Sequence, residues 1–154
     1  MSMQRPGNAT SPRGGPQYGQ SSGGVTASMA MSPEDARKII VEGDAELLVR
    51  HAEELARQIK ISKSSRTSVR RLFSEVRLIE MIWRDKARAN DARRRSILFR
   101  PRLAYQVGRD STLFKLQQVL EPLLKDVGGD RVRFGHFVEF FEAVVAFLPR
   151  ASER

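Results

Sequence analysis

The sequence predicts an all-α protein, a small bundle of about five helices that follows a disordered N-terminal tail. Apolar residues recur at three- and four-residue spacings over most of residues 32–150, and no stretch shows the strict alternation of a half-buried strand. Capping residues, glycines and prolines divide this pattern into units of helix length. Because 154 residues suit one ordinary domain, we expect a tail over residues 1–31 and one helical bundle domain over residues 32–150.

The tail is rich in glycine, proline, serine and glutamine and nearly free of large aliphatic side chains. Such a segment cannot bury enough apolar surface to offset its conformational entropy. We interpret it as a disordered extension. The alternative is an accessory RNA-contacting arm that uses Arg5, Arg13 and Tyr18.

The first helix should begin after Ser32, which can cap it, with Pro33 at the first helical position and acidic residues in the first turn. Gly43 and Asp44 predict a break. Helical spacing then continues to about Lys60, so we expect one broken helix or two short ones.

The longest helix is predicted from Ser64 or Ser65 to about Ala87, on a stripe formed by Val69, Leu72, Phe73, Val76, Ile79 and Trp83. After a loop around residues 88–96, the segment "FRPRLAYQVGR" (99–109) should become helical at Pro101. Its bundle-facing residues are predicted to be Leu103, Ala104, Val107 and Gly108. The small residues Ala104 and Gly108 would allow a neighbouring helix to approach closely.

A further helix is expected over residues 112–127, with a kink at Pro122. The sequence "VGGD" should end it and open the last helix, which Pro149 stops. One face of the last helix is predicted to carry Phe134, Phe137, Phe141, Val144, Val145 and Leu148.

The charge is concentrated in the middle of the chain. The formal net charge is +9, yet residues 60–110 hold 15 basic and 5 acidic residues, a net charge of +10. This concentration indicates a polyanionic partner, nucleic acid before an anionic membrane. The chain has no cysteine and no run of about 20 apolar residues, so we expect a cytoplasmic protein that is neither secreted nor inserted in a membrane.

Arginines are spaced along the longest predicted helix so that they share a face. Arg66, Arg70, Arg77 and Arg84 project within about 40° of one another over about 27 Å. Guanidinium groups at this spacing could follow a phosphate backbone, whereas a solvated face with local ion pairs is the alternative. Arg102, Tyr105 and Arg109 likewise lie within about 60°, and Tyr105 could be a contact or a half-buried core residue.

The sequence contains few candidate catalytic or metal-binding residues. His136, Glu139 and Glu142 could share a helix face, but one histidine with two acids is more typical of an amphipathic surface than of a metal site. No phosphate-binding glycine loop, nucleophile elbow or zinc-ligand spacing is present. We therefore predict no catalytic residue, no metal ligand and no cofactor. The Arg93, Arg94 and Arg95 run could lie in a solvated loop, contact a partner or contact phosphate.

Three blocks resemble the small subunit of type III-A CRISPR effectors, the Csm complex: "RTSVRRLFSEV" (66–76), "FRPRLAYQVGR" (99–109) and "FVEFFEAVVAF" (137–147). The resemblance implies a non-catalytic, all-helical subunit of an antiviral ribonucleoprotein. Several copies would stack in the inner filament, beside backbone subunits that hold the guide RNA and near the large subunit. A basic face would hold the target RNA paired to the guide.

The resemblance places RNA contacts in its first two blocks, and the arginine stripe adds Arg77 and Arg84. We call the resulting nine residues the predicted basic set: Lys63, Arg66, Arg70, Arg71, Arg77, Arg84, Arg100, Arg102 and Arg109. The alternative function is a small helical DNA-binding protein or transcription regulator, since the same charge would suit a helix in a major groove.

Overall fold

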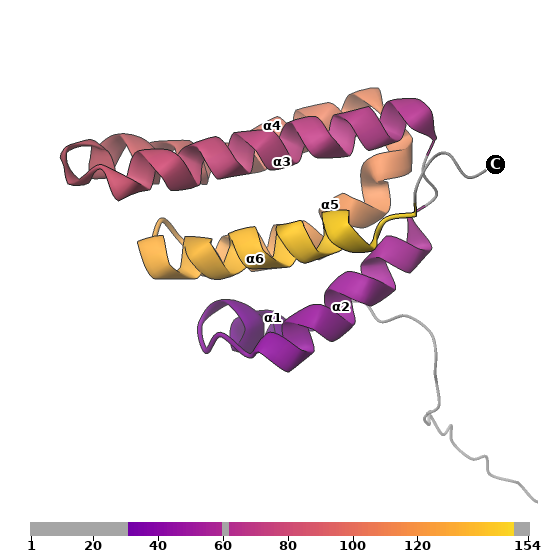
Figure 1. The fold of residues 1–154 in the computed structure, drawn as a ribbon, viewed down its shortest axis with the longest axis horizontal. Coiled ribbons are helices and arrows are strands. Elements are labelled where there is room, and N and C mark those ends of the chain that lie inside the picture. Colours follow the sequence, from indigo (N-terminus) through magenta and orange to yellow (C-terminus); the bar gives the residue numbers. More distant parts are fainter. Residues whose placement is uncertain (1–30, 60–61, 150–154) are drawn as a thin grey trace, which may run out of the picture.

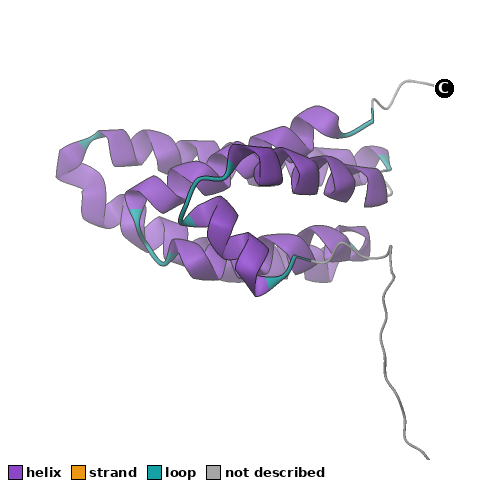
Figure 2. Ribbon diagram, turned by 90° about the horizontal axis from the view of Figure 1, so that it is seen from below, coloured by secondary structure: helices purple, strands orange, loops and turns teal. Residues whose placement is uncertain are grey.

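A computed structural model describes residues 31–59 and 62–149, and all the regular structure in these ranges is helical. Six α-helices and two short 3-10 helices follow one another: α1 (Pro33–Ile40), α2 (Ala45–Gln58), α3 (Lys63–Arg84), η2 (Lys86–Arg88), α4 (Ala89–Arg109), η3 (Ser111–Leu113), α5 (Phe114–Val127) and α6 (Arg131–Phe147). Figure 2 shows these helices joined by short loops. The all-α prediction is confirmed.

The predicted tail falls outside the described residues except for its last residue, Met31. That methionine is only 8% exposed and belongs to the hydrophobic core. Order therefore includes the residue just before the Ser32 cap.

The last helix in the sequence is the central helix of the bundle. Figure 1 shows α6 between the long antiparallel hairpin of α3 and α4 on one side and α1 with α2 on the other. Its buried residues are Phe134, Phe137, Val138, Phe140, Phe141 and Val144, a wider apolar surface than one stripe, as a helix covered on several sides requires. The ring of Phe137 lies 6.2 Å from that of Phe99 on α4, so aromatic packing joins the centre to the hairpin.

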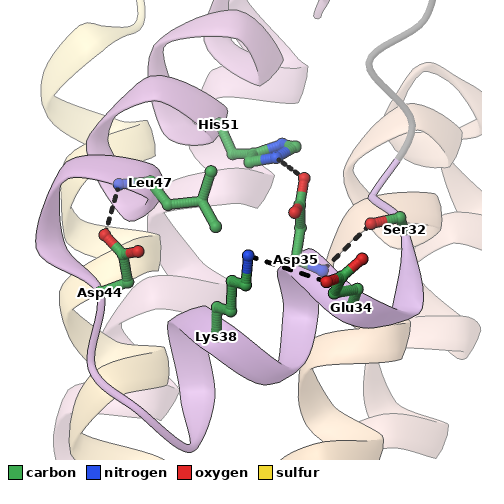
Figure 3. A network of polar contacts seen from close by, with 7 residues as sticks. All are labelled: Ser32, Glu34, Asp35, Lys38, Asp44, Leu47 and His51. Atoms are coloured by element: carbon green, nitrogen blue, oxygen red, sulfur yellow. Dashed lines mark hydrogen bonds and ion pairs between the residues drawn. The ribbon is translucent and has the colours of Figure 1, made fainter.

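The break between α1 and α2 lies where the sequence predicted it. Ser32 Oγ accepts a hydrogen bond from the Asp35 backbone N–H, and Asp44 Oδ1 accepts one from the Leu47 N–H, both at 3.0 Å (Figure 3). Gly43 turns the chain with a positive φ of 72°. A 2.9 Å contact between His51 Nε2 and Asp35 Oδ2 then holds α2 to α1.

The structure corrects the start of the helix that contains Pro101. We expected a loop over residues 88–96, but α4 begins at Ala89 and continues through the proline. The core-facing residues of α4 are Ala92, Ser96, Phe99, Leu103 and Val107. Helical geometry places Pro101 on the opposite side, about 160° away, where water can solvate the carbonyl that loses its N–H partner.

A second correction concerns the small residues of this helix. Leu103 and Val107 are buried as predicted, but Ala104 and Gly108 are exposed. A Cβ atom added at Gly108 would have no neighbour within 4 Å, so no helix approaches closely there. The neighbours of α4 pack instead on the side that carries Phe99 and Leu103.

The remaining boundaries follow the capping residues. Ser62 caps α3, which ends at Arg84, and α5 begins at Phe114 after the turn of η3. The helix α5 continues through Pro122 and ends at Gly128 and Gly129, whose φ angles are +54° and +81°. Across residues 31–59 and 62–149, none of the helices is long and apolar enough to span a bilayer.

Candidate nucleic-acid interface

The structure distributes the predicted basic set over several surfaces of α3 and α4. Arg71 and Arg102 line the groove between the two helices, whereas Arg100 is on the side of α4 that meets α5. Arg66 and Arg84 lie on the side of α3 that meets α6 and its C-terminal end. The nine residues therefore do not form one continuous face.

Arg100 is engaged within the bundle. Its Nε donates to Glu121 Oε2 of α5 at 2.8 Å, and its terminal nitrogen donates to the same oxygen at 2.5 Å. The pair joins α4 to α5, since the two residues are 21 positions apart in the chain. Arg100 would have to leave this carboxylate to bind a phosphate.

Arg102 forms a two-pronged ion pair with Glu75 of α3, with distances of 2.8 and 2.9 Å. The hydrogen bonds and the charge of Glu75 raise the pKa of the Arg102 guanidinium above its usual value. The pair is well exposed on the arginine side, so it stabilises the fold by about 1 kcal/mol at most. Arg102 thereby neutralises Glu75, the one acid among the described residues that lines this part of the groove.

The arginines of the predicted stripe on α3 have different partners within the fold. Arg66 donates to the backbone carbonyl of Pro149, and its Nε is buried without a partner in the described part of the chain. Arg77 lies 3.4 Å from Glu80 and 5.9 Å from the ring centroid of Phe73. Arg84 borders a pocket with Trp83 and residues of α6. These side chains are partly committed to the fold.

A polar junction fixes the end of the hairpin where α3 begins and α4 ends. Ser65, only 1% exposed, donates to Asp110 Oδ2 at 3.0 Å and lies 2.5 Å from the hydroxyl of Thr112. The Thr112 hydroxyl and N–H also donate to Asp110 Oδ1, at 2.6 and 3.1 Å. The hydrogen bond from the Thr112 side chain, helped by that from Ser65, lowers the pKa of the Asp110 carboxyl.

Four basic side chains lie in the first three turns of α3 or at the end of α4, and we call them the hairpin-end cluster: Lys63, Arg70, Arg71 and Arg109. All four are exposed, and none forms an ion pair with an acid in the described ranges. On α3, Lys63, Arg70 and Arg71 span about 100° of the outward surface. Arg84, near the hairpin turn, also has no ion pair in these ranges, so the cluster is the part of the uncompensated charge that gathers at the open end of the hairpin.

Tyr105, which the sequence left between core and contact, is on the surface. Its side chain is 66% exposed, and the Arg109 guanidinium lies 5.9 Å from its ring centroid. The groove beside it is lined by Arg71, Leu72, Glu75, Pro101, Arg102, Tyr105 and Gln106. Sequence reasoning missed Gln106 and Pro101 as groove residues, because the groove depends on the tertiary packing of α4 against α3.

The arginine run 93–95 lies on α4 rather than in a loop. Arg95 Nε donates to Asp91 at 3.0 Å, one helical turn earlier, a pairing that the four-residue spacing could have indicated. The side chain of Arg93 covers Gly129, where an added Cβ would lie 2.9 Å from its Nε. At least two of the three arginines thus have local roles.

The histidine of the metal alternative serves the fold. His136 Nδ1 donates to the carbonyl oxygen of Ile40 at 2.7 Å, which ties α6 to the end of α1. In the ranges that the structure describes, no three histidine or acidic side chains lie close enough together to hold a metal ion.

Comparison with known proteins identifies the family. The family model described as Csm2 Type III-A matches residues 42–153, more than two thirds of the chain. No curated protein and no solved structure matches the chain. The match covers α2 through α6 and therefore the hairpin, its polar junction and the hairpin-end cluster. The chain belongs to the Csm2 family of type III-A CRISPR systems, the non-catalytic small subunit of the Csm complex.

Proposed function

We propose that this subunit holds target RNA, paired to the guide RNA, through phosphate contacts made by the hairpin-end cluster. The uncompensated charge of Lys63, Arg70, Arg71 and Arg109 carries this proposal. A flexible, exposed guanidinium without a carboxylate partner can bind phosphate oxygens at no cost in broken ion pairs. Contacts of this kind would hold the backbone of any sequence, as a guide-directed complex requires.

The other members of the predicted basic set would contact the RNA only after the hairpin-end cluster has bound it. Arg100 and Arg102 must exchange Glu121 and Glu75 for phosphate, and Arg66 must leave the Pro149 carbonyl. Arg77 and Arg84 extend the basic surface along α3 toward the hairpin turn. We assign these five residues to secondary contacts, made once the cluster has positioned the RNA.

The subunit would work in the cytoplasm as part of the ribonucleoprotein. Its partners would be the target and guide RNAs, the backbone and large subunits and further copies of the same chain stacked in the inner filament. Exposed apolar side chains near the turn of the α3–α4 hairpin would serve the protein contacts: Leu78, Met81, Ile97 and Leu98. Membrane binding has no place in this proposal.

The test replaces Arg70 and Arg71 together by alanine, in the Csm complex assembled with guide RNA. These two residues have no ion pair with the rest of the described chain, so the fold should persist. Target RNA should bind more weakly, and the slope of log affinity against log salt should decrease by about one for each phosphate that the variant no longer neutralises.

Arg57→Ala is the matched control, because it removes a similarly exposed arginine from α2, where Glu53 and Glu54 already pair with it. The control should leave both affinity and salt slope unchanged. Equal affinity and slope for the double variant and the wild-type complex would contradict the proposal.

A further inference from the structure

The groove between α3 and α4 has an exposed aromatic ring at its basic end. Tyr105 is the most exposed large apolar or aromatic side chain among the described residues, at 66%. Its hydroxyl forms no hydrogen bond with the described part of the chain, and the ring forms no aromatic pair there. The ring therefore contributes little to the core, which Phe99 and Leu103 supply from the opposite side of the same helix.

The surroundings of the ring are cationic. Arg109, one turn further along α4, places its guanidinium 5.9 Å from the ring centroid. Arg71 of α3 lines the same groove as Tyr105. The Glu75 carboxylate, which also lines it, is already paired with Arg102. A ligand on this ring would meet positive charge that no nearby acid in the described residues balances.

The remaining groups around the ring match the parts of a nucleotide. Aromatic faces and guanidinium planes stack on bases, and every base offers such a face whatever the sequence. Gln106 lines the same groove and has both a donor and an acceptor for the edge of a base. Arg109 lies beside the ring and Arg71 lines the same groove, so both guanidinium groups are placed for phosphates next to a stacked base.

We propose that Tyr105 is a stacking platform for an unpaired RNA base, with Arg71 and Arg109 binding the flanking phosphates. This inference rests on the proposed RNA-binding function and adds a contact to a base to the contacts with the backbone. RNA is favoured over a protein partner because none of the exposed aliphatic side chains of the hairpin, Leu78, Met81, Ile97 and Leu98, lines the groove with Tyr105. The groove end at Tyr105 instead combines an exposed ring with Arg71 and Arg109, and neither arginine is paired with an acid in the described ranges.

The experiment measures binding of the full-length chain to two single strands of equal length, an oligouridine and the same backbone without bases. Wild-type protein should bind the oligouridine more tightly. Tyr105→Ala should weaken binding to the oligouridine by about 5- to 100-fold and leave binding to the abasic strand unchanged. The salt slope should stay the same, because stacking releases no counterions.

Two variants sharpen the comparison. Tyr105→Phe keeps the ring and should bind the oligouridine within about twofold of wild type if stacking is the contribution. Phe114→Ala removes another exposed ring, 54% exposed at the start of α5, and should have no effect on either strand. Arg71→Ala should weaken binding to both strands and lower the slope of log affinity against log salt.

The outcomes separate this inference from the proposed function. Equal, salt-dependent binding of wild-type protein to both strands would overturn the stacking role and leave the backbone contacts supported. Equal loss on both strands in Tyr105→Ala would also overturn it, as would a loss of assembly into the Csm complex with RNA binding unchanged. Absence of binding by the wild-type chain to either strand would contradict the proposed function as well.

Discussion

Single residues at the hairpin end show how the fold positions charge. Ser65 is buried where a surface helix would ordinarily carry an exposed serine, and its partner Asp110 lies 45 residues away. Thr112 completes the junction through its hydroxyl and its N–H. The three residues hold the ends of α3 and α4 together, and with them Arg70, Arg71 and Arg109. An acid in a basic surface here organises the cations rather than neutralising them.

Asp110→Asn should therefore destabilise the protein in a pH-dependent manner. The folded pKa of Asp110 lies below the ordinary value of 3.8, so its charged form stabilises the fold above that pH, and this contribution is lost as pH falls through the folded pKa. At pH 7 the variant should lose about 1 kcal/mol of unfolding free energy. Urea unfolding of both proteins between pH 7 and the acid range measures the difference.

The difference between the two proteins should shrink as the pH falls below 3.8, because wild-type Asp110 then becomes neutral as well. Asp126→Asn is the control, since the Asp126 carboxylate forms no hydrogen bond with the described residues and the charge change is the same. A pH-independent difference would show that the charge of Asp110 does not contribute.

Sequence reasoning located the basic residues but could not tell which of them form ion pairs within the fold. The partner of Arg102 is 27 positions away and that of Arg100 is 21 positions away, so helical spacing cannot reveal either ion pair. The contact of Arg66 with Pro149 spans 83 positions. Which arginines keep an uncompensated charge is decided by tertiary packing, and only the structure shows it.

At the scale of elements, capping residues predicted boundaries better than proline did. Ser32 caps the helix that it was expected to cap, and the break predicted at Gly43 and Asp44 is where Asp44 caps α2; both caps act through bonds three residues away. Pro101 was interpreted as a start because proline favours the first turn, yet it lies inside α4. Burial of Ala92, Ser96 and Phe99 upstream of it stabilises the helix more than the proline weakens it.

Pro101→Ala should accordingly stabilise the protein. Alanine would restore an N–H donor to the Ile97 carbonyl and remove the steric strain of a proline in a helix interior, which costs about 3 kcal/mol. The more flexible unfolded chain returns up to about 1 kcal/mol of this gain. We expect a rise of about 1 to 2 kcal/mol in unfolding free energy, measured by urea denaturation.

Pro33→Ala provides the comparison, because Pro33 occupies the first position of α1, where no helical hydrogen bond is missing. This variant should gain nothing. A loss of stability in Pro101→Ala would instead show that the proline ring supports the groove that it lines with Tyr105 and Arg102.

At the scale of the whole molecule, the two halves of the α3–α4 hairpin are both basic but differ in their exposed apolar side chains. The hairpin-end cluster and Tyr105 lie in the half of the hairpin where α3 begins and α4 ends, and the exposed Leu78, Met81, Ile97 and Leu98 lie in the half that contains the turn. Figure 1 shows the antiparallel pairing of the two helices. Periodicity in the sequence predicted the all-α bundle and its buried aromatic last helix. It could not predict this separation, which depends on the antiparallel pairing of α3 with α4.

The two ends should be separable by mutation. Leu98 is 41% exposed and lines the groove beside Leu78, so Leu98→Glu would place a charge in any protein contact made there. Fewer copies of this subunit should enter the assembled Csm complex, with affinity for assembly reduced at least about tenfold. Native mass spectrometry of the reconstituted complex gives the copy number.

RNA binding by the isolated Leu98→Glu chain should stay at the wild-type level, whereas Arg70→Ala with Arg71→Ala should show the reverse pattern, normal copy number with weakened RNA binding. Val49→Glu is the matched control, since Val49 is 44% exposed on α2, far along the chain from the hairpin turn, and should change neither property. If Leu98→Glu assembles fully, the apolar end of the hairpin is not a subunit contact. If it also loses RNA affinity, the two ends act as one surface, and the division of protein and RNA contacts along the hairpin is wrong.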